Sequence, residues 1–133
     1  MDPDKVTHGI IGAAMKVHTA LGPGLLESAY EACLAHELQL RGFTVERQIE
    51  VPVFYEGLRV GVAYRMDMLI EDEVVVELKA VDRLGAVHTM QLLSHLRLTK
   101  RRVGLLINFN SARLKDGIRR VVNGYTECTE LTG

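Results

Sequence analysis

The chain has 133 residues, a net charge of −1 and an apolar fraction of 47%, which together predict one soluble globular domain with its own core. This balance excludes the overall basicity that would by itself indicate a nucleic-acid-binding protein. The two cysteines lack zinc-site spacing, and no apolar run is long enough to span a membrane. The acidic opening MDPDK lacks the apolar core of a signal peptide, so we expect a cytoplasmic protein without a membrane partner.

Two helices are predicted at the start of the chain. Asp2 and Pro3 form a strong helix start, a capping acid followed by proline at the first helical position, and apolar residues then recur at helical spacing. The Gly-Pro-Gly sequence at 22–24 ends this helix. A second helix is predicted from about 25 to 41, because its apolar residues share one face and Gly42 supplies a C-cap.

Three strands are predicted in the middle of the chain. Residues 43–53 alternate between apolar and polar, and a turn at 56–57 leads into a second strand over 58–70. An acidic break at 71–73 separates it from a third strand over 74–80, which is rich in valine.

The remaining elements are a helix over 86–98, a strand over 103–109 and a closing helix. The run at 103–109 is continuously apolar, as in strands buried on both faces. Leu114, Ile118 and Val121 have helical spacing and suggest the closing helix. The predicted order is α-α-β-β-β-α-β-α within a single domain, 1–133, whose tail after about residue 124 is expected to be frayed.

The most informative stretch is RMDMLIEDEVVVELKAV at residues 65–81, which carries Asp67, Glu77 and Lys79. Alternation along a strand places Glu77 and Lys79 on one face. Charges at the end of an apolar strand are costly to bury unless they are paired or bind a metal. The alternative to a functional site is a structural ion-pair cluster on a solvated sheet face.

The length of the turn between these strands is a test of the site. A two-residue loop at 71–72 would set Asp67 opposite Val76 and on the face away from Glu77. A three-residue loop at 71–73 sets Asp67 opposite Glu77, and opposed residues share a face. A shared metal site therefore requires the three-residue loop or a bulge.

Four motifs in order carry a family resemblance: VHTALGPGLLESAYE, RMDMLIEDEVVVELKAV, QLLSHL and VGLLINFN. The chain resembles the PD-(D/E)XK nuclease superfamily and, within it, the GxxExxY protein family. The resemblance covers about residues 6–123. It implies an α/β fold with a restriction-endonuclease-like core, a central mixed β-sheet flanked by helices.

The chemistry of phosphodiester cleavage fits these residues. Mg²⁺ or Mn²⁺ activates water and offsets charge on the phosphate, and Mg²⁺ needs only a few carboxylates because it keeps several waters. Asp67 and Glu77 would be the ligands, with help from the Leu78 carbonyl, while Lys79 would orient or deprotonate the water. Glu27 would complete the metal shell directly or through water, and the resemblance implies the same roles. The alternative for Glu27 is an acid favoured by the helix dipole.

Gln91 lies on the helix that follows the Glu-Leu-Lys strand. Exonuclease-type members of the superfamily often have Gln-x-x-x-Tyr there, and the glutamine helps to organise the site; here the last position is His95. The alternative for Gln91 is a polar rim residue.

His88 and His95 are too far apart along a helix to chelate one ion easily. His18 is expected to have a capping or packing role and not a catalytic one. Tyr30 is expected to belong to the core.

The function indicated is a metal-dependent nuclease that acts on DNA or RNA phosphodiesters, with DNA favoured over RNA as the substrate. The alternatives are a catalytically silent nucleic-acid-binding or accessory protein and a purely structural dimer module. The basic residues near 100–102 and 113–120 would hold phosphates if the closing helix stood beside the site. Few aromatic residues are present, so base stacking is not indicated. A homodimer is expected, with Phe54, Tyr55 and Leu58 as candidate contacts.

Overall fold

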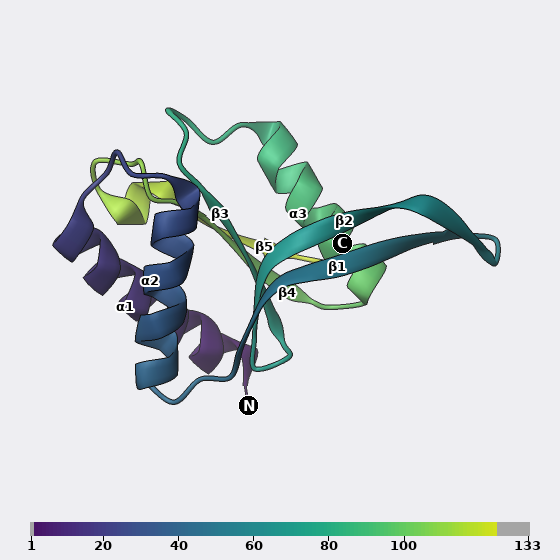
Figure 1. Ribbon diagram of the computed structural model, residues 1–133, viewed down its shortest axis with the longest axis horizontal. Coiled ribbons are helices and arrows are strands. Elements are labelled where there is room, and N and C mark those ends of the chain that lie inside the picture. Colours follow the sequence, from purple (N-terminus) through teal and green to yellow (C-terminus); the bar gives the residue numbers. More distant parts are fainter. Residues whose placement is uncertain (1, 125–133) are drawn as a thin grey trace.

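The computed structural model describes residues 2–124 and contains a five-stranded sheet in the order β1-β2-β3-β4-β5 (Figure 1). The sheet is mixed, because β3 and β4 run parallel while the other neighbours are antiparallel. The strands are β1 (Val45–Tyr55), β2 (Leu58–Ile70), β3 (Val74–Lys79), β4 (Val103–Asn108) and β5 (Ile118–Val122). The helices are α1 (Pro3–Leu21), α2 (Glu27–Leu40) and α3 (Ala86–Thr99).

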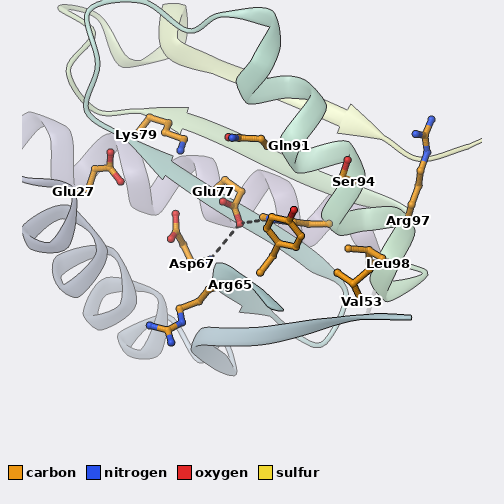
Figure 2. Close-up of a pocket in the computed structure, with 12 residues that line it drawn as sticks. Glu27, Val53, Arg65, Asp67, Glu77, Lys79, Gln91, Ser94, Arg97 and Leu98 are labelled. Atoms are coloured by element: carbon orange, nitrogen blue, oxygen red, sulfur yellow. Dashed lines mark hydrogen bonds and ion pairs between the residues drawn. The ribbon is translucent and has the colours of Figure 1, made fainter. Parts of the chain in front are cut away.

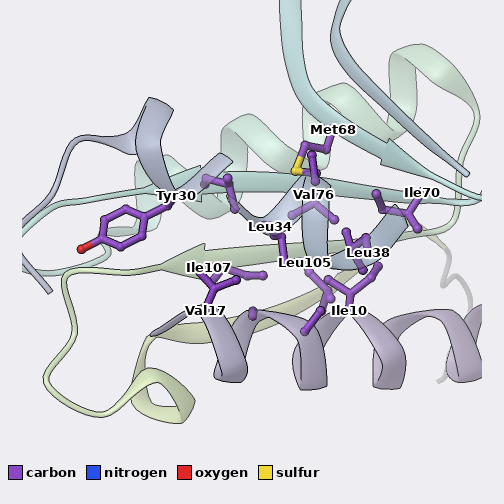
Figure 3. Packing of buried hydrophobic residues seen from close by; sticks show 14 of the residues in the cluster. Ile10, Val17, Tyr30, Leu34, Leu38, Met68, Ile70, Val76, Leu105 and Ile107 are labelled. Atoms are coloured by element: carbon purple, nitrogen blue, oxygen red, sulfur yellow. The ribbon is translucent and has the colours of Figure 1, made fainter. Parts of the chain in front are cut away.

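The two faces of the sheet are covered by different helices. One core layer joins α1 and α2 to the sheet through side chains such as Ile10, Leu34 and Val76 (Figure 3). The other layer packs Leu92 and Leu96 of α3 against the opposite face. Burial from both sides explains the apolar runs at 74–76 in β3 and 103–107 in β4, as predicted for the strand over 103–109.

The predicted closing helix is wrong. A short 3-10 helix, η1 (Leu114–Gly117), is followed by β5, which pairs with β4 from Ile107↔Ile118 to Val103↔Val122. The apolar residues fit a helical period, but pairing with the open edge of β4 satisfies the backbone of this β-branched segment better than an isolated turn. The predicted tail lies outside the described residues.

A two-stranded arm leaves the sheet (Figure 1). β1 and β2 pair along their whole length, from Val45↔Ile70 to Tyr55↔Leu58, whereas β2 pairs with β3 only over Met68–Ile70. The residues of β2 before Met68 therefore diverge from β3, and the sheet forks at this point. No helix among residues 2–124 is long and apolar enough to cross a membrane.

Candidate active site

A pocket of about 700 Å³ opens at the fork between β2 and β3. Its lining combines acidic, basic, amide and apolar side chains from the arm, β3, α2 and α3 (Figure 2). The lining residues are Glu27, Val53, Tyr64, Arg65, Asp67, Glu77, Lys79, Gln91, Ser94, His95, Arg97 and Leu98. All five candidate catalytic residues, Glu27, Asp67, Glu77, Lys79 and Gln91, therefore line one cavity.

The register of β2 and β3 brings the two central carboxylates together. The pairs Met68↔Val76 and Ile70↔Val74 leave a three-residue turn at 71–73, which confirms the register that a shared site requires. The Leu78 N–H donates to Asp67 Oδ2 at 2.8 Å, and the Asp67 N–H donates to Glu77 Oε2 at 3.3 Å. Each carboxylate is thus held by the backbone of the opposite strand.

A kink in β1 accompanies this arrangement. Gln48 has a positive φ of 53°, and the ladder between β1 and β2 skips its position opposite Asp67. The Gln48 side chain donates to the buried Glu31 at 2.6 Å, and Arg47 pairs with the same carboxylate at 2.9 Å. Anchoring to Glu31 on α2 holds the kink, and the freed Asp67 N–H is the one that binds Glu77.

Asp67 is in an environment that disfavours its negative charge. Partial burial, followed by the charge of Glu77, raises the pKa of Asp67 from 3.8 to about 6, against the opposing effect of the Leu78 N–H. Glu31 and Glu27 add smaller repulsions in the same direction. The pocket thus concentrates negative charge at the end of β2, and a bound cation would relieve it.

His95 is the neighbour of Glu77 that sequence reasoning left without a role. Glu77 is 7% exposed and His95 is 8% exposed. The His95 Nδ1 atom lies 3.4 Å from Glu77 Oε2 but makes no hydrogen bond, and it is buried. The sequence signal was its position four residues after Gln91, which places both side chains on one face of α3.

The cationic and amide groups reach the pocket from different elements. Lys79 ends β3, and Figure 2 shows the Gln91 amide extending from α3 toward it. Lys79, Arg65 and Arg97 line the pocket, and within residues 2–124 none of them forms an ion pair. Their charges are therefore available to a ligand.

Tyr30 positions the turn that presents Glu27. Its hydroxyl donates to the Gly22 carbonyl at 2.6 Å and accepts from the Leu25 N–H at 3.0 Å. Its ring stacks on Phe109 with centroids 4.6 Å apart and is fully buried, which confirms the prediction that Tyr30 belongs to the core. This anchoring holds Glu27 at the first position of α2, beside the pocket.

Two further residues missed by sequence reasoning hold the connection between β3 and α3. The buried Asn108 side chain accepts from the Val81 N–H at 3.0 Å and donates to the Val81 carbonyl at 2.9 Å. Arg119 donates to the Leu84 carbonyl at 2.9 Å and to Thr89 at 2.9 Å. Both contacts fix where α3 starts relative to Lys79.

Two arginines of the basic clusters form ion pairs away from the pocket. Arg101 pairs with Asp72 in the turn at the opposite end of β3 from Lys79, and Arg120 pairs with Asp4 of α1. The closing helix that would have carried one cluster to the site does not form. His18 forms a hydrogen bond through Nε2 with the Ser111 carbonyl oxygen at 2.8 Å, and its ring centroid lies 6.4 Å from that of Phe109.

The donor set fits a hard divalent cation. Asp67 and Glu77 are adjacent carboxylates, and burial together with the charge of Glu77 raises the pKa of Asp67. Among residues 2–124 no group of three His, Cys, Asp or Glu side chains encloses a metal position. Mg²⁺ suits such a site, because it uses one or two carboxylates and keeps several waters.

The family follows from the whole-chain comparison. Residues 4–121 match the model of the PD-(D/E)XK nuclease superfamily. No curated protein and no solved structure gives a significant match. The mixed sheet flanked by helices is consistent with the restriction-endonuclease-like fold of that superfamily. Because the match spans most of the chain, this protein belongs to the PD-(D/E)XK nuclease superfamily.

Proposed function

We propose that this protein is a metal-dependent nuclease of the GxxExxY branch that hydrolyses phosphodiester bonds of nucleic acid, and we favour DNA over RNA as its substrate. The observation that carries the proposal is the convergence of Asp67, Glu77 and Lys79 in one pocket at the fork of the sheet. A purely structural ion-pair cluster would pair Lys79 with a carboxylate, and no such pair occurs among residues 2–124.

Asp67 and Glu77 would hold Mg²⁺ or Mn²⁺, and Glu27 would contact it directly or through water. The cation would supply an activated water and offset charge on the phosphate. The backbone N–H groups of Leu78 and Asp67 keep the two carboxylates in place, so little reorganisation is needed for binding.

Lys79 would orient the attacking water through its Nζ atom and offset charge that develops on the phosphate oxygens. Gln91 would bond a metal ligand or a metal-bound water from α3. The side chain of His95 lies behind Glu77 and limits the positions that this carboxylate adopts. The cytoplasmic location predicted from the cysteine pattern suits a nuclease with access to nucleic acid.

The test is cleavage of labelled DNA and RNA oligonucleotides by the purified protein with Mg²⁺, with Mn²⁺ and with EDTA. We expect cleavage with either metal and none with EDTA, because the carboxylates hold water and phosphate only through a cation. Isothermal titration should show the matching metal-binding event. Binding of nucleic acid without cleavage in the presence of any metal would contradict the nuclease proposal and favour the catalytically silent accessory protein.

We further propose that the arm mediates a homodimer. Its tip exposes Phe54, Tyr55 and Leu58, which are 58%, 67% and 65% exposed. An apolar tip on a projecting two-stranded arm is costly in water and suits an isologous contact with a second copy. Light scattering should give a dimer at micromolar concentration, and Leu58→Asp should give a monomer. A monomer mass for the unchanged protein would contradict the dimer.

A further inference from the structure

The pocket contains an apolar wall that phosphodiester hydrolysis does not use. Val53 and Tyr64 of the arm and Leu98 of α3 line the same cavity as the carboxylates, and Figure 2 shows Val53 beside Leu98. Tyr64 is 55% exposed. Its ring centroid is 6.1 Å from that of His95, at an interplanar angle of 47°. One side of the Tyr64 ring is therefore near the helix, and much of the ring remains available to a ligand.

The charges around this wall suit a chain of phosphates. Arg65 and Arg97 come from the arm and from α3, and Figure 2 shows Arg65 near Asp67 and Arg97 on the far side of Glu77. Neither arginine nor Lys79 has an ion-pair partner within residues 2–124. Cations spaced on both sides of an acidic centre would contact phosphates on either side of the bond to be cut.

The carboxylates are recessed, which restricts the form of the substrate. Glu77 is 7% exposed, and the pocket lies between the arm and α3 rather than on an open face. A stacked duplex presents its phosphates on a stiff backbone with the bases turned inward. A single strand bends freely and turns its bases outward, so it brings a phosphate and a base into one cavity.

We propose that the pocket binds a single-stranded segment of nucleic acid, with one unpaired base against Tyr64 and the adjacent phosphate at Asp67 and Glu77. This assigns a substrate class to the proposed nuclease and rests on that function. It differs from the expectation from composition, which gave no indication of base stacking. The aromatic residues are few, but the fold places one of them beside the carboxylates.

The experiment measures binding of fluorescein-labelled 12-nucleotide DNA probes by anisotropy, with Ca²⁺ in place of Mg²⁺ and with the probe checked on a gel for integrity. The probes are a single strand, the same strand in a duplex, and an abasic strand of equal length. We expect the single strand to bind about 10-fold more tightly than either of the other probes, because stacking on one aromatic ring is worth about that much.

The variants separate the contribution of base stacking on Tyr64 to the binding affinity from the effect of removing any exposed apolar side chain. Tyr64→Ala is expected to weaken single-strand binding about 10-fold and to leave abasic-strand binding unchanged, while Tyr64→Phe keeps the affinity. Met90→Ala is the matched control, since Met90 is an exposed apolar residue of α3 outside the pocket. Circular dichroism confirms that each variant is folded.

Equal affinity for the single strand and the duplex would overturn the inference, as would an unchanged affinity in Tyr64→Ala. Cleavage of duplex DNA that does not depend on Tyr64 would overturn it too but would leave the nuclease proposal standing. Tyr64-dependent binding of the single strand, without cleavage in the presence of any metal, would support the base pocket and contradict the nuclease proposal.

Discussion

Replacing Asp67 by asparagine is expected to abolish binding of Mg²⁺ and Mn²⁺ and, at neutral pH, to stabilise the metal-free protein. The first effect follows because Asp67 is one of two carboxylates that face the proposed ion. The second follows because burial and the Glu77 charge raise the pKa of Asp67 to about 6, so its ionised form is disfavoured in the folded state. Asparagine removes that charge at similar volume.

The pH dependence has a definite sign. Since the folded pKa of about 6 lies above the ordinary value of 3.8, the folded state binds the Asp67 proton more tightly than the unfolded state does. The unfolding free energy contributed by this group therefore falls as pH rises from about 4 to about 6, and it stays lower at higher pH. With allowance for the partial exposure of Asp67, the loss is about 1 to 2 kcal/mol.

Urea unfolding of the metal-free wild type and of Asp67→Asn between pH 4 and pH 8 measures this effect. The variant should be the more stable of the two above pH 6, and the difference should shrink toward pH 4. Asp116→Asn, at an exposed position of η1, is the matched control and should follow the wild type. Metal binding by Asp67→Asn equal to that of the wild type would remove Asp67 from the site.

Replacing Lys79 by alanine is expected to lower kcat by about 10²- to 10⁴-fold, the range for loss of a group that acts on the water or on transition-state charge. Affinity for the nucleic acid should change by less than about threefold, because Arg65 and Arg97 also line the pocket and would still contact the phosphates. Lys115→Ala, at an exposed position of η1, is the control for loss of one positive charge.

Single-turnover cleavage and anisotropy, measured on the same oligonucleotide, separate these two effects. A Lys79→Ala protein with full activity would exclude lysine from the mechanism. A variant that cleaves at the normal rate once bound, but binds poorly, would make Lys79 a phosphate-binding residue instead.

Local rules limited the central carboxylate pair to two arrangements, which differ in the length of the turn between β2 and β3. Side-chain alternation along β3 places Glu77 and Lys79 on one face, and an acidic turn of three residues places Asp67 opposite Glu77. Most helices and strands were also predictable, since their periodicity and their end signals are local. These features depend on residues within about ten positions of one another, where sequence patterns are most informative.

The sequence by itself determined the order of most elements and the common face of Glu77 and Lys79 on β3. It left two registers of β2 on β3 open, and the structure has the one that sets Asp67 opposite Glu77. Only the tertiary structure decided the last strand, because Leu114, Ile118 and Val121 fit a helix until the open edge of β4 is available for pairing. Tertiary packing also brought His95 against Glu77 and set Tyr64 beside the carboxylates. Such contacts join residues far apart in the chain, and their free energy depends on burial and pairing that no local pattern contains.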